Sequence, residues 1–192
     1  NINIGLEHGN EEFRAKVLKR RMANKRIINS LQLLENADIP VTVNNIMGYP
    51  DETRDLIFDT IELNREVSTA TINAYLYNPY KGTELYDVCL EKGYLPKEGD
   101  EKTVDISLST EDYAYFKTVL DMPSISKQEL MGLQKTFVLY AKLPKYEFPR
   151  IEIAEKNNEE GLKMYGELSE EYSDVLAGVK QLETSVKEYL QA

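Results

Sequence analysis

The feature that most constrains the fold is an alternation of short apolar runs with segments of helical spacing. The strand-like runs cover residues 2–7, 41–46 and 71–77, and each is followed by a polar loop and then by apolar residues at helical spacing. Such alternation is typical of parallel βα units, because parallel strands need a crossover connection that is usually a helix. The sequence therefore predicts an α/β fold for residues 1–95.

Local signals mark the helices of these units. Asn10 stands before an acidic first turn, Asn24 is placed to cap a second helical segment, and Asp51 or Thr53 is placed to cap a third. A shorter helix is expected to end near Gly93. Each strand should therefore end in a loop just before a helix begins.

Three polar loops, at residues 7–10, 44–50 and 77–83, follow the expected strands. In parallel α/β folds ligands bind where the carboxyl ends of strands meet. Three βα units make half of a TIM-like barrel, and their edge strand would be left unpaired. We therefore expect a partial barrel whose other half is the N-terminal half of the same polypeptide.

The second half of the chain, residues 96–192, differs in composition and is predicted to be an α-helical extension. It is rich in Glu, Lys and Tyr, and it lacks strand patterns. Ser126 is placed to cap a helix with apolar residues on one face from Leu130 to Tyr140, which Pro144 should end. A longer helix is expected over residues 158–190, although glycines interrupt it.

Composition excludes several classes of function. The formal net charge is -10, which argues against general binding of nucleic acid or of anionic membranes. No apolar run approaches the roughly 20 residues that span a bilayer, so a cytoplasmic location is expected. The chain has one cysteine and one histidine, so it cannot build a closed Cys/His metal site, and no metal ligand is predicted.

The three loops resemble, in the same order, three strand ends of radical S-adenosylmethionine (SAM) enzymes, in the branch that carries an N-terminal cobalamin-binding domain. The family patterns are Gly-x-Glu-x-Gly-Asn, then Gly-x-Ile-x-Gly-x-x-Glu, often found as Ile-x-Gly-x-Pro-Gly-Glu-Thr, and then Pro-x-x-Gly-Thr-x-Leu. They are met here by Gly5, Glu7, Gly9, Asn10; Ile46, Gly48, Pro50, Glu52, Thr53; and Pro79, Gly82, Thr83, Leu85. The tail "LPKYEFPRIEIAEKNNEEG" also resembles such proteins, whereas Asn44 departs from a family glycine.

This resemblance implies a set of SAM-binding residues. Glu7 would accept hydrogen bonds from the ribose or the amino group, and Asn45 would hydrogen-bond SAM from the strand end. Residues Ile46 to Gly48 would lie against the adenine, and the backbone from Tyr77 to Pro79 would follow the edge of the base. No residue of the chain is assigned a catalytic role.

The resemblance also implies cofactors of a parent protein. A 4Fe-4S cluster would cleave SAM reductively, with radical or cobalamin-dependent methyl-transfer chemistry on an unknown substrate. The Cys-x-x-x-Cys-x-x-Cys motif that holds this cluster is absent from the chain, as is the cobalamin domain. The chain alone is therefore expected to be inactive.

Two other interpretations remain open at this point. One is a non-catalytic α/β binding module with an acidic helical partner surface, and the other is an aldolase-like barrel fragment with Lys81 as its reactive amine. His8 is expected to be a polar loop residue on the solvent side, and Cys89 a small buried residue of a helix.

Overall fold

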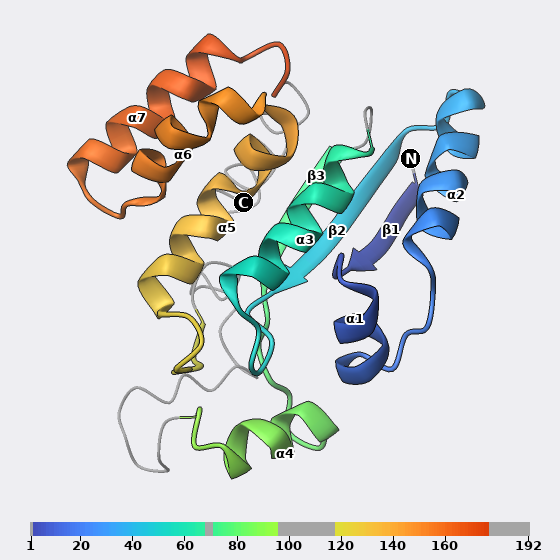
Figure 1. The fold of residues 1–192 in the computed structure, drawn as a ribbon, viewed down its shortest axis with the longest axis vertical. Coiled ribbons are helices and arrows are strands. Elements are labelled where there is room, and N and C mark those ends of the chain that lie inside the picture. The colour runs from blue at the N-terminus through green and yellow to red at the C-terminus, as the bar shows by residue number, and fades with distance from the viewer. Residues whose placement is uncertain (1, 68–70, 96–117, 177–192) are drawn as a thin grey trace, which may run out of the picture.

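A parallel sheet is the centre of the structure, a computed structural model that describes residues 2–67, 71–95 and 118–176. Strands β1 (Ile2–Glu7), β2 (Val41–Met47) and β3 (Thr71–Leu76) pair in the order β1-β2-β3 (Figure 1). Both pairings are parallel. The predicted α/β class and its three strands are confirmed, each strand to within one residue.

Seven α-helices lie in the described residues. They are α1 (Glu11–Val17), α2 (Asn24–Asn36), α3 (Arg54–Arg65), α4 (Glu84–Glu91), α5 (Lys127–Lys142), α6 (Phe148–Glu155) and α7 (Glu159–Glu171), with a short 3-10 helix, η1 (Lys145–Glu147), before α6. None of these helices is long and apolar enough to cross a bilayer.

Side-chain caps begin most of the helices that the sequence predicts. Asn10 accepts from the backbone N–H of Phe13, Thr53 rather than Asp51 caps α3, and Ser126 caps α5. The expectation for Asn24 is wrong, because Ala23 is the N-cap of α2 and no side chain caps it. The Asn24 amide donates instead to the Gly9 carbonyl, 2.7 Å away, and so ties α2 to the loop after β1.

One face of the sheet packs against helices. Ile4, Val43 and Ile72 stand in register across the three strands and point toward this layer. Helices α2 and α3 cover β1 and β2 through apolar residues such as Leu31, and α5 covers β3. Burial of these apolar residues stabilises the layer by about 1.5–3 kcal/mol for each fully buried large side chain.

The opposite face of the sheet is polar. Gly5, Asn44 and Asn73 form a row in register, and Asn73 donates from Nδ2 to Asn44 Oδ1 at 2.9 Å. Thr42 and Thr71 form the next row. Parallel sheets usually carry apolar residues on both faces, so a polar face is the kind of surface that a site would use.

The helical extension completes the third βα unit. The short helix expected to end near Gly93 is confirmed as α4, but it buries only Cys89, and α5 is the helix that packs on β3. The predicted apolar face of α5, which includes Leu133 and Phe137, is buried in one core with Ile72 and residues of α3. The boundary predicted after residue 95 stays a prediction, since residues 96–117 lie outside the described part.

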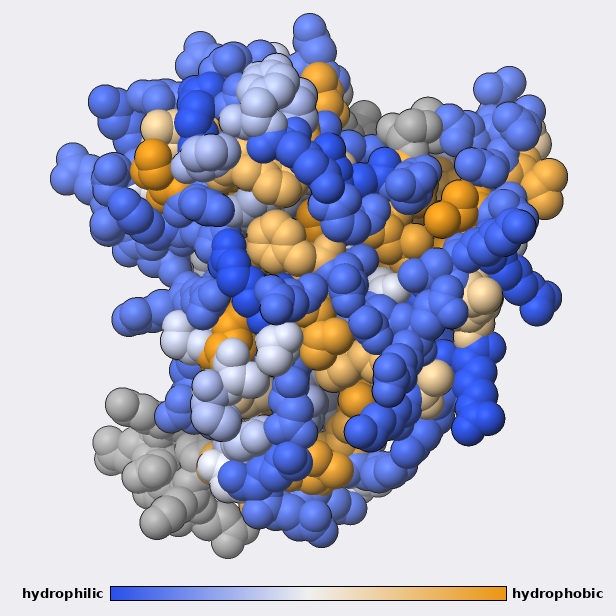
Figure 2. Space-filling model, viewed as in Figure 1, coloured by the Kyte–Doolittle hydropathy of each residue, from blue (hydrophilic) through white to orange (hydrophobic). Residues whose placement is uncertain are grey.

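Helices α6 and α7 stack outside α5 (Figure 1). Of the long helix expected over residues 158–190, α7 ends at Glu171, and residues 177–190 lie outside the described part. Figure 2 shows that hydrophilic residues dominate the visible outer surface of these helices. Acidic residues of α7 such as Glu159, Glu160 and Glu167 are exposed to solvent.

Candidate ligand site at the carboxyl ends of the strands

Glu7 ends β1 in a strained turn. Its φ is 68°, and the N–H of His8 donates to the carbonyl of Leu6 at 2.9 Å, which closes a γ-turn around Glu7. The pairing of β1 with β2 shifts register between Gly5 and Glu7. Turns with a positive central φ are rare, and such strain concentrates at binding and catalytic sites. The backbone turn thus changes the direction of the Glu7 side chain from the one that regular strand alternation would give.

The Glu7 carboxylate lies over the polar face of the sheet. A Cβ atom at Gly5 would stand 2.3 Å from Glu7 Oε1, so the carboxylate occupies the space above this glycine. Arg20 holds it there, with Nη1 3.1 Å from Oε1 and Nη2 donating to the Gly5 carbonyl at 3.3 Å. The Glu7 side chain remains 23% exposed, so it is open to a ligand that replaces Arg20.

The loop after β2 is shaped by a buried carboxylate. Glu52 accepts hydrogen bonds at Oε2 from the backbone N–H groups of Gly48 and of Tyr49, the latter at 3.0 Å. Gly48 has a φ of 83°, and a Cβ atom there would stand 2.6 Å from Cδ2 of Leu130 in α5. Glycine is therefore required here both by the backbone conformation and by the approach of α5.

His8 lies inside the protein, so the expectation that it faces solvent is wrong. It is fully buried, its Nε2 is 2.8 Å from Oε1 of the equally buried Glu52, and its ring stacks on Phe13 with centroids 4.3 Å apart. The sequence motif includes Glu52 but does not predict its contact with His8. The contact between His8 and Glu52 connects the loop after β1 to the loop after β2. The two residues lie far apart in the sequence, so the sequence alone does not predict this contact.

Two tyrosines line the ends of β2 and β3. The rings of Tyr49 and Tyr77 lie 4.9 Å apart, and the N–H of Tyr77 donates to the Met47 carbonyl at 2.8 Å. Burial, followed by the negative charges of Glu7 and Glu52, raises the pKa of Tyr49 far above its ordinary value. Burial also raises the pKa of Tyr77 to about 12. Both phenols are therefore neutral near pH 7 and act here as packing and hydrogen-bonding groups.

The other residues of the predicted site divide between the two faces of the sheet. Ile46 is half-buried, in register with Tyr75 near the polar face, and Pro79 is buried in the third loop. Asn45 points the other way: its Nδ2 donates to Asn64 Oδ1 at 3.1 Å, and Asn64 donates back at 2.9 Å. The Asn45 side chain is thus occupied in tying β2 to α3.

Lys81 and Cys89 show no features of a reactive site. Lys81 is exposed in the turn before α4, where the burial that activates a catalytic amine is missing. Cys89 is fully buried, and burial, followed by the charge of Asp51, raises the pKa of its thiol to about 11. The expectation for Cys89 is confirmed, and its thiol is inert rather than nucleophilic.

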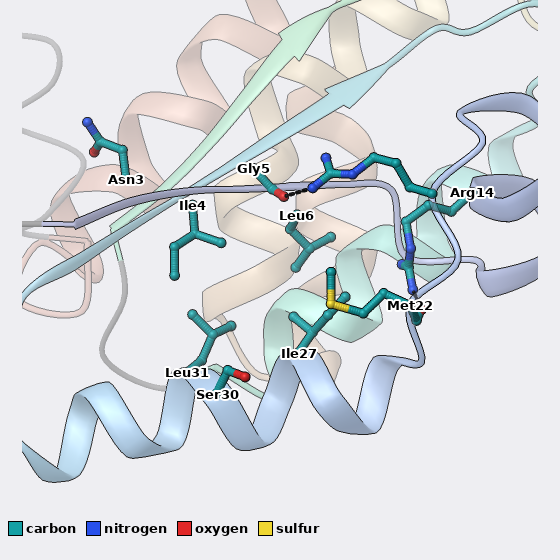
Figure 3. Close-up of a pocket in the computed structure, with 10 residues that line it drawn as sticks. Asn3, Ile4, Gly5, Leu6, Arg14, Met22, Ile27, Ser30 and Leu31 are labelled. Carbon is teal, nitrogen blue, oxygen red and sulfur yellow. Dashed lines mark hydrogen bonds between the residues drawn. The ribbon is translucent and has the colours of Figure 1, made fainter.

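A cavity of about 260 Å³ lies between β1 and α2, apart from the three loops. Figure 3 shows Ile4 and Leu6 pointing into the space between β1 and α2, where they face Ile27 and Leu31. In the described residues β1 pairs only with β2, so the other edge of β1 presents unpaired backbone groups.

Comparison with known proteins gives distant matches to one enzyme. No family model matches the chain. The tRNA-2-methylthio-N(6)-dimethylallyladenosine synthase of Halalkalibacterium halodurans is 30% identical over 84 residues, which are 43% of this chain and 15% of the relative. The synthase of Thermosipho melanesiensis is 28% identical over 85 residues, 43% of this chain and 20% of the relative. The synthase of Bacillus cereus is 26% identical over 84 residues, which are 43% of this chain and 16% of the relative.

These synthases are radical SAM methylthiotransferases, so the chain has weak homology to a radical SAM enzyme. The matched region spans no more than 20% of the length of these relatives.

Proposed function

We propose that this chain forms one wall of the SAM site of a radical SAM enzyme. The observation that carries the proposal is the Glu7 carboxylate, set on a strained turn above the polar face of the sheet and beside the Gly48 loop. The order of the three loop motifs and the distant similarity to radical SAM methylthiotransferases support the same class.

Each loop has a part in the proposed site. Glu7 accepts hydrogen bonds from the ribose hydroxyls or the ammonium of SAM, in exchange for its pair with Arg20. The segment from Ile46 to Gly48 lies against the adenine, and the backbone from Tyr77 to Pro79 follows the edge of the base. Asn45 contributes by holding β2 to α3, since its amide is used there.

The fold fits a partial TIM-like barrel completed by the N-terminal half of the same polypeptide. The edge of β1 that pairs with no strand in the described residues offers a place for a further strand. The polar face of the sheet would then line the inside of the barrel, and α2, α3 and α5 its outside. The greater length of the relatives leaves room for such a half.

In this proposal a 4Fe-4S cluster, when bound, supplies the electron that cleaves SAM. Its thiolates must come from another part of the polypeptide, because this chain has one cysteine, which is buried. A cobalamin partner domain and cobalamin-dependent methyl transfer are proposed from the loop motifs alone. The cytoplasmic location also stays a prediction.

The substrate is not assigned. The relatives are named for a modified adenosine in tRNA. This chain has a formal net charge of -10, which opposes contact with a nucleic-acid backbone, so we do not extend tRNA binding to it.

The test is a binding measurement on the intact protein that carries this chain. Glu7→Gln removes the charge but keeps the size, and we expect the Kd for SAM, measured by equilibrium dialysis, to rise at least tenfold, since about 1.4 kcal/mol of charge-assisted hydrogen bonding is lost. Glu170→Gln on exposed α7 is the matched control and should change the Kd less than twofold. Equal affinities of Glu7→Gln and wild type would remove Glu7 from the site. No binding of SAM by wild type at millimolar concentration would favour the non-catalytic binding module.

A further inference from the structure

The two ring nitrogens of His8 have different partners, which fixes where its proton lies. The backbone N–H of Asn10, which can only donate, points to Nδ1 at 3.0 Å. Nδ1 therefore carries no proton, and the proton of the neutral ring is on Nε2. This is the nitrogen that lies 2.8 Å from Glu52 Oε1, and neither of these two buried atoms has a hydrogen bond to any other described residue.

Glu52 is a buried carboxyl group with two backbone donors at one oxygen and the close imidazole nitrogen of His8 at the other. Its Oε2 takes the N–H groups of Gly48 and Tyr49, and its Oε1 faces His8. It also directly precedes Thr53, the N-cap of α3, where the helix dipole favours a negative charge. The position of the Gly48 loop therefore depends on this carboxylate, and the carboxylate depends on its donors.

His8 is also the residue that closes the turn of Glu7. Its backbone N–H donates to the Leu6 carbonyl across Glu7, and its carbonyl accepts from the buried Arg14 guanidinium. Its ring is held by stacking on Phe13. One fixed residue thus joins the strained Glu7 turn to the Gly48 loop.

We infer that His8 is a positioning residue: through Glu52 it holds the Gly48–Tyr49 backbone in a fixed position relative to Glu7. It thereby aligns the Glu7 turn with the Gly48 loop, the two parts of the site that bind the adenosine of SAM. This inference rests on the proposed function. It adds a residue that contacts no ligand and acts through the contact of its Nε2 with Glu52.

The experiment compares His8→Gln with His8→Met in the intact protein. Gln and Met have the same chain length, but only the Gln side chain can donate to Glu52. We expect His8→Gln to bind SAM within threefold of wild type and His8→Met to bind at least tenfold more weakly. His8→Met should lose affinity for 5′-deoxyadenosine by the same factor, because the substitution affects the part of the site that binds adenosine. Similar Kd values for Met and wild type, or a loss equal in the Gln and Met variants, would overturn the inference.

A second measurement uses wild type alone and so does not depend on how the variants fold. The amides of Gly48 and Tyr49 should be protected from hydrogen exchange without SAM, because Glu52 already holds them. Exchange at the rate of an open loop would also overturn the inference. Binding of SAM by wild type, with no effect at position 8, would leave the proposed function intact. Failure of wild type to bind SAM would remove the proposed function itself.

Discussion

Gly9 shows at the residue scale how closely the first loop packs on α3. A Cβ atom at Gly9 would stand 2.2 Å from the Asp59 carbonyl oxygen and 2.4 Å from Thr60 Cα, both of them backbone atoms. The Gly9 N–H also donates to Thr60 Oγ1 at 2.9 Å. Even the smallest side chain must therefore push the loop, with the Glu7 turn, away from the helix.

We predict that Gly9→Ala lowers the free energy of unfolding by about 1–3 kcal/mol, as overpacking does. Gly166 is the matched control, because a Cβ atom there meets nothing within 4 Å and the residue lies inside α7. Gly166→Ala should raise stability by about 0.5–1 kcal/mol. Urea unfolding of both variants measures the difference, and an unchanged Gly9→Ala would contradict the packing described here.

Single residues also mark where prediction from sequence succeeds and fails. Glu7 and Gly48 could be predicted because the site depends on local features, a strand end and a glycine turn. The burial of His8 could not, because it depends on Glu52, which follows 44 positions later and is brought there by the pairing of β1 with β2. Asn45 was assigned to the ligand, and only its partner Asn64 shows which face its amide uses.

At the element scale, Arg54 joins the sheet layer to the extension. It begins α3, contacts Glu155 of α6 through two hydrogen bonds of 2.8 and 2.6 Å, and lies 3.3 Å from Glu129 of α5. Its guanidinium also stands 5.1 Å from the centroid of the Phe58 ring. Such bidentate, partly buried pairs contribute more than exposed ones.

Arg54→Ala should lower the free energy of unfolding by about 1–3 kcal/mol. The substitution removes the Arg54 partner of Glu155, whose side chain is only 13% exposed. Lys163→Ala should change stability by less than about 0.5 kcal/mol, since its side chain is 78% exposed and its pair with Glu167 spans 3.8 Å. Thermal unfolding of the two variants provides the comparison. Equal melting temperatures of the Arg54→Ala and Lys163→Ala variants would show that the contact between Arg54 and Glu155 does not stabilise the protein.

Periodicity and caps located α3, α4 and α5, but they did not indicate which helix covers β3. Spacing of apolar residues indicates that a helix has a buried side, but it does not state which surface that side meets. The choice between α4 and α5 is made by packing against Ile72 and Leu76, far away in the sequence.

At the scale of the whole molecule, the parallel sheet has one apolar face under helices and one polar face with Glu7 above it. The alternation of strands and helices could be predicted from the sequence because it depends on local patterns, namely short apolar runs and apolar residues at helical spacing. The polar face could not, because it appears only once the register aligns Gly5, Asn44 and Asn73. In the proposed barrel, the edge of β1 that pairs with no strand in the described residues is where the other half would join.

In the proposed site, SAM binds at the carboxyl ends of these three strands. Hydrogen exchange of the intact protein, with and without SAM, tests this location. We predict that SAM protects residues 5–10 and 77–83, slows exchange further at Gly48 and Tyr49, whose amides Glu52 already holds, and leaves α6 and α7 unchanged. If SAM binds, as shown by dialysis, while none of the three loops gains protection, the site lies elsewhere and the account is wrong.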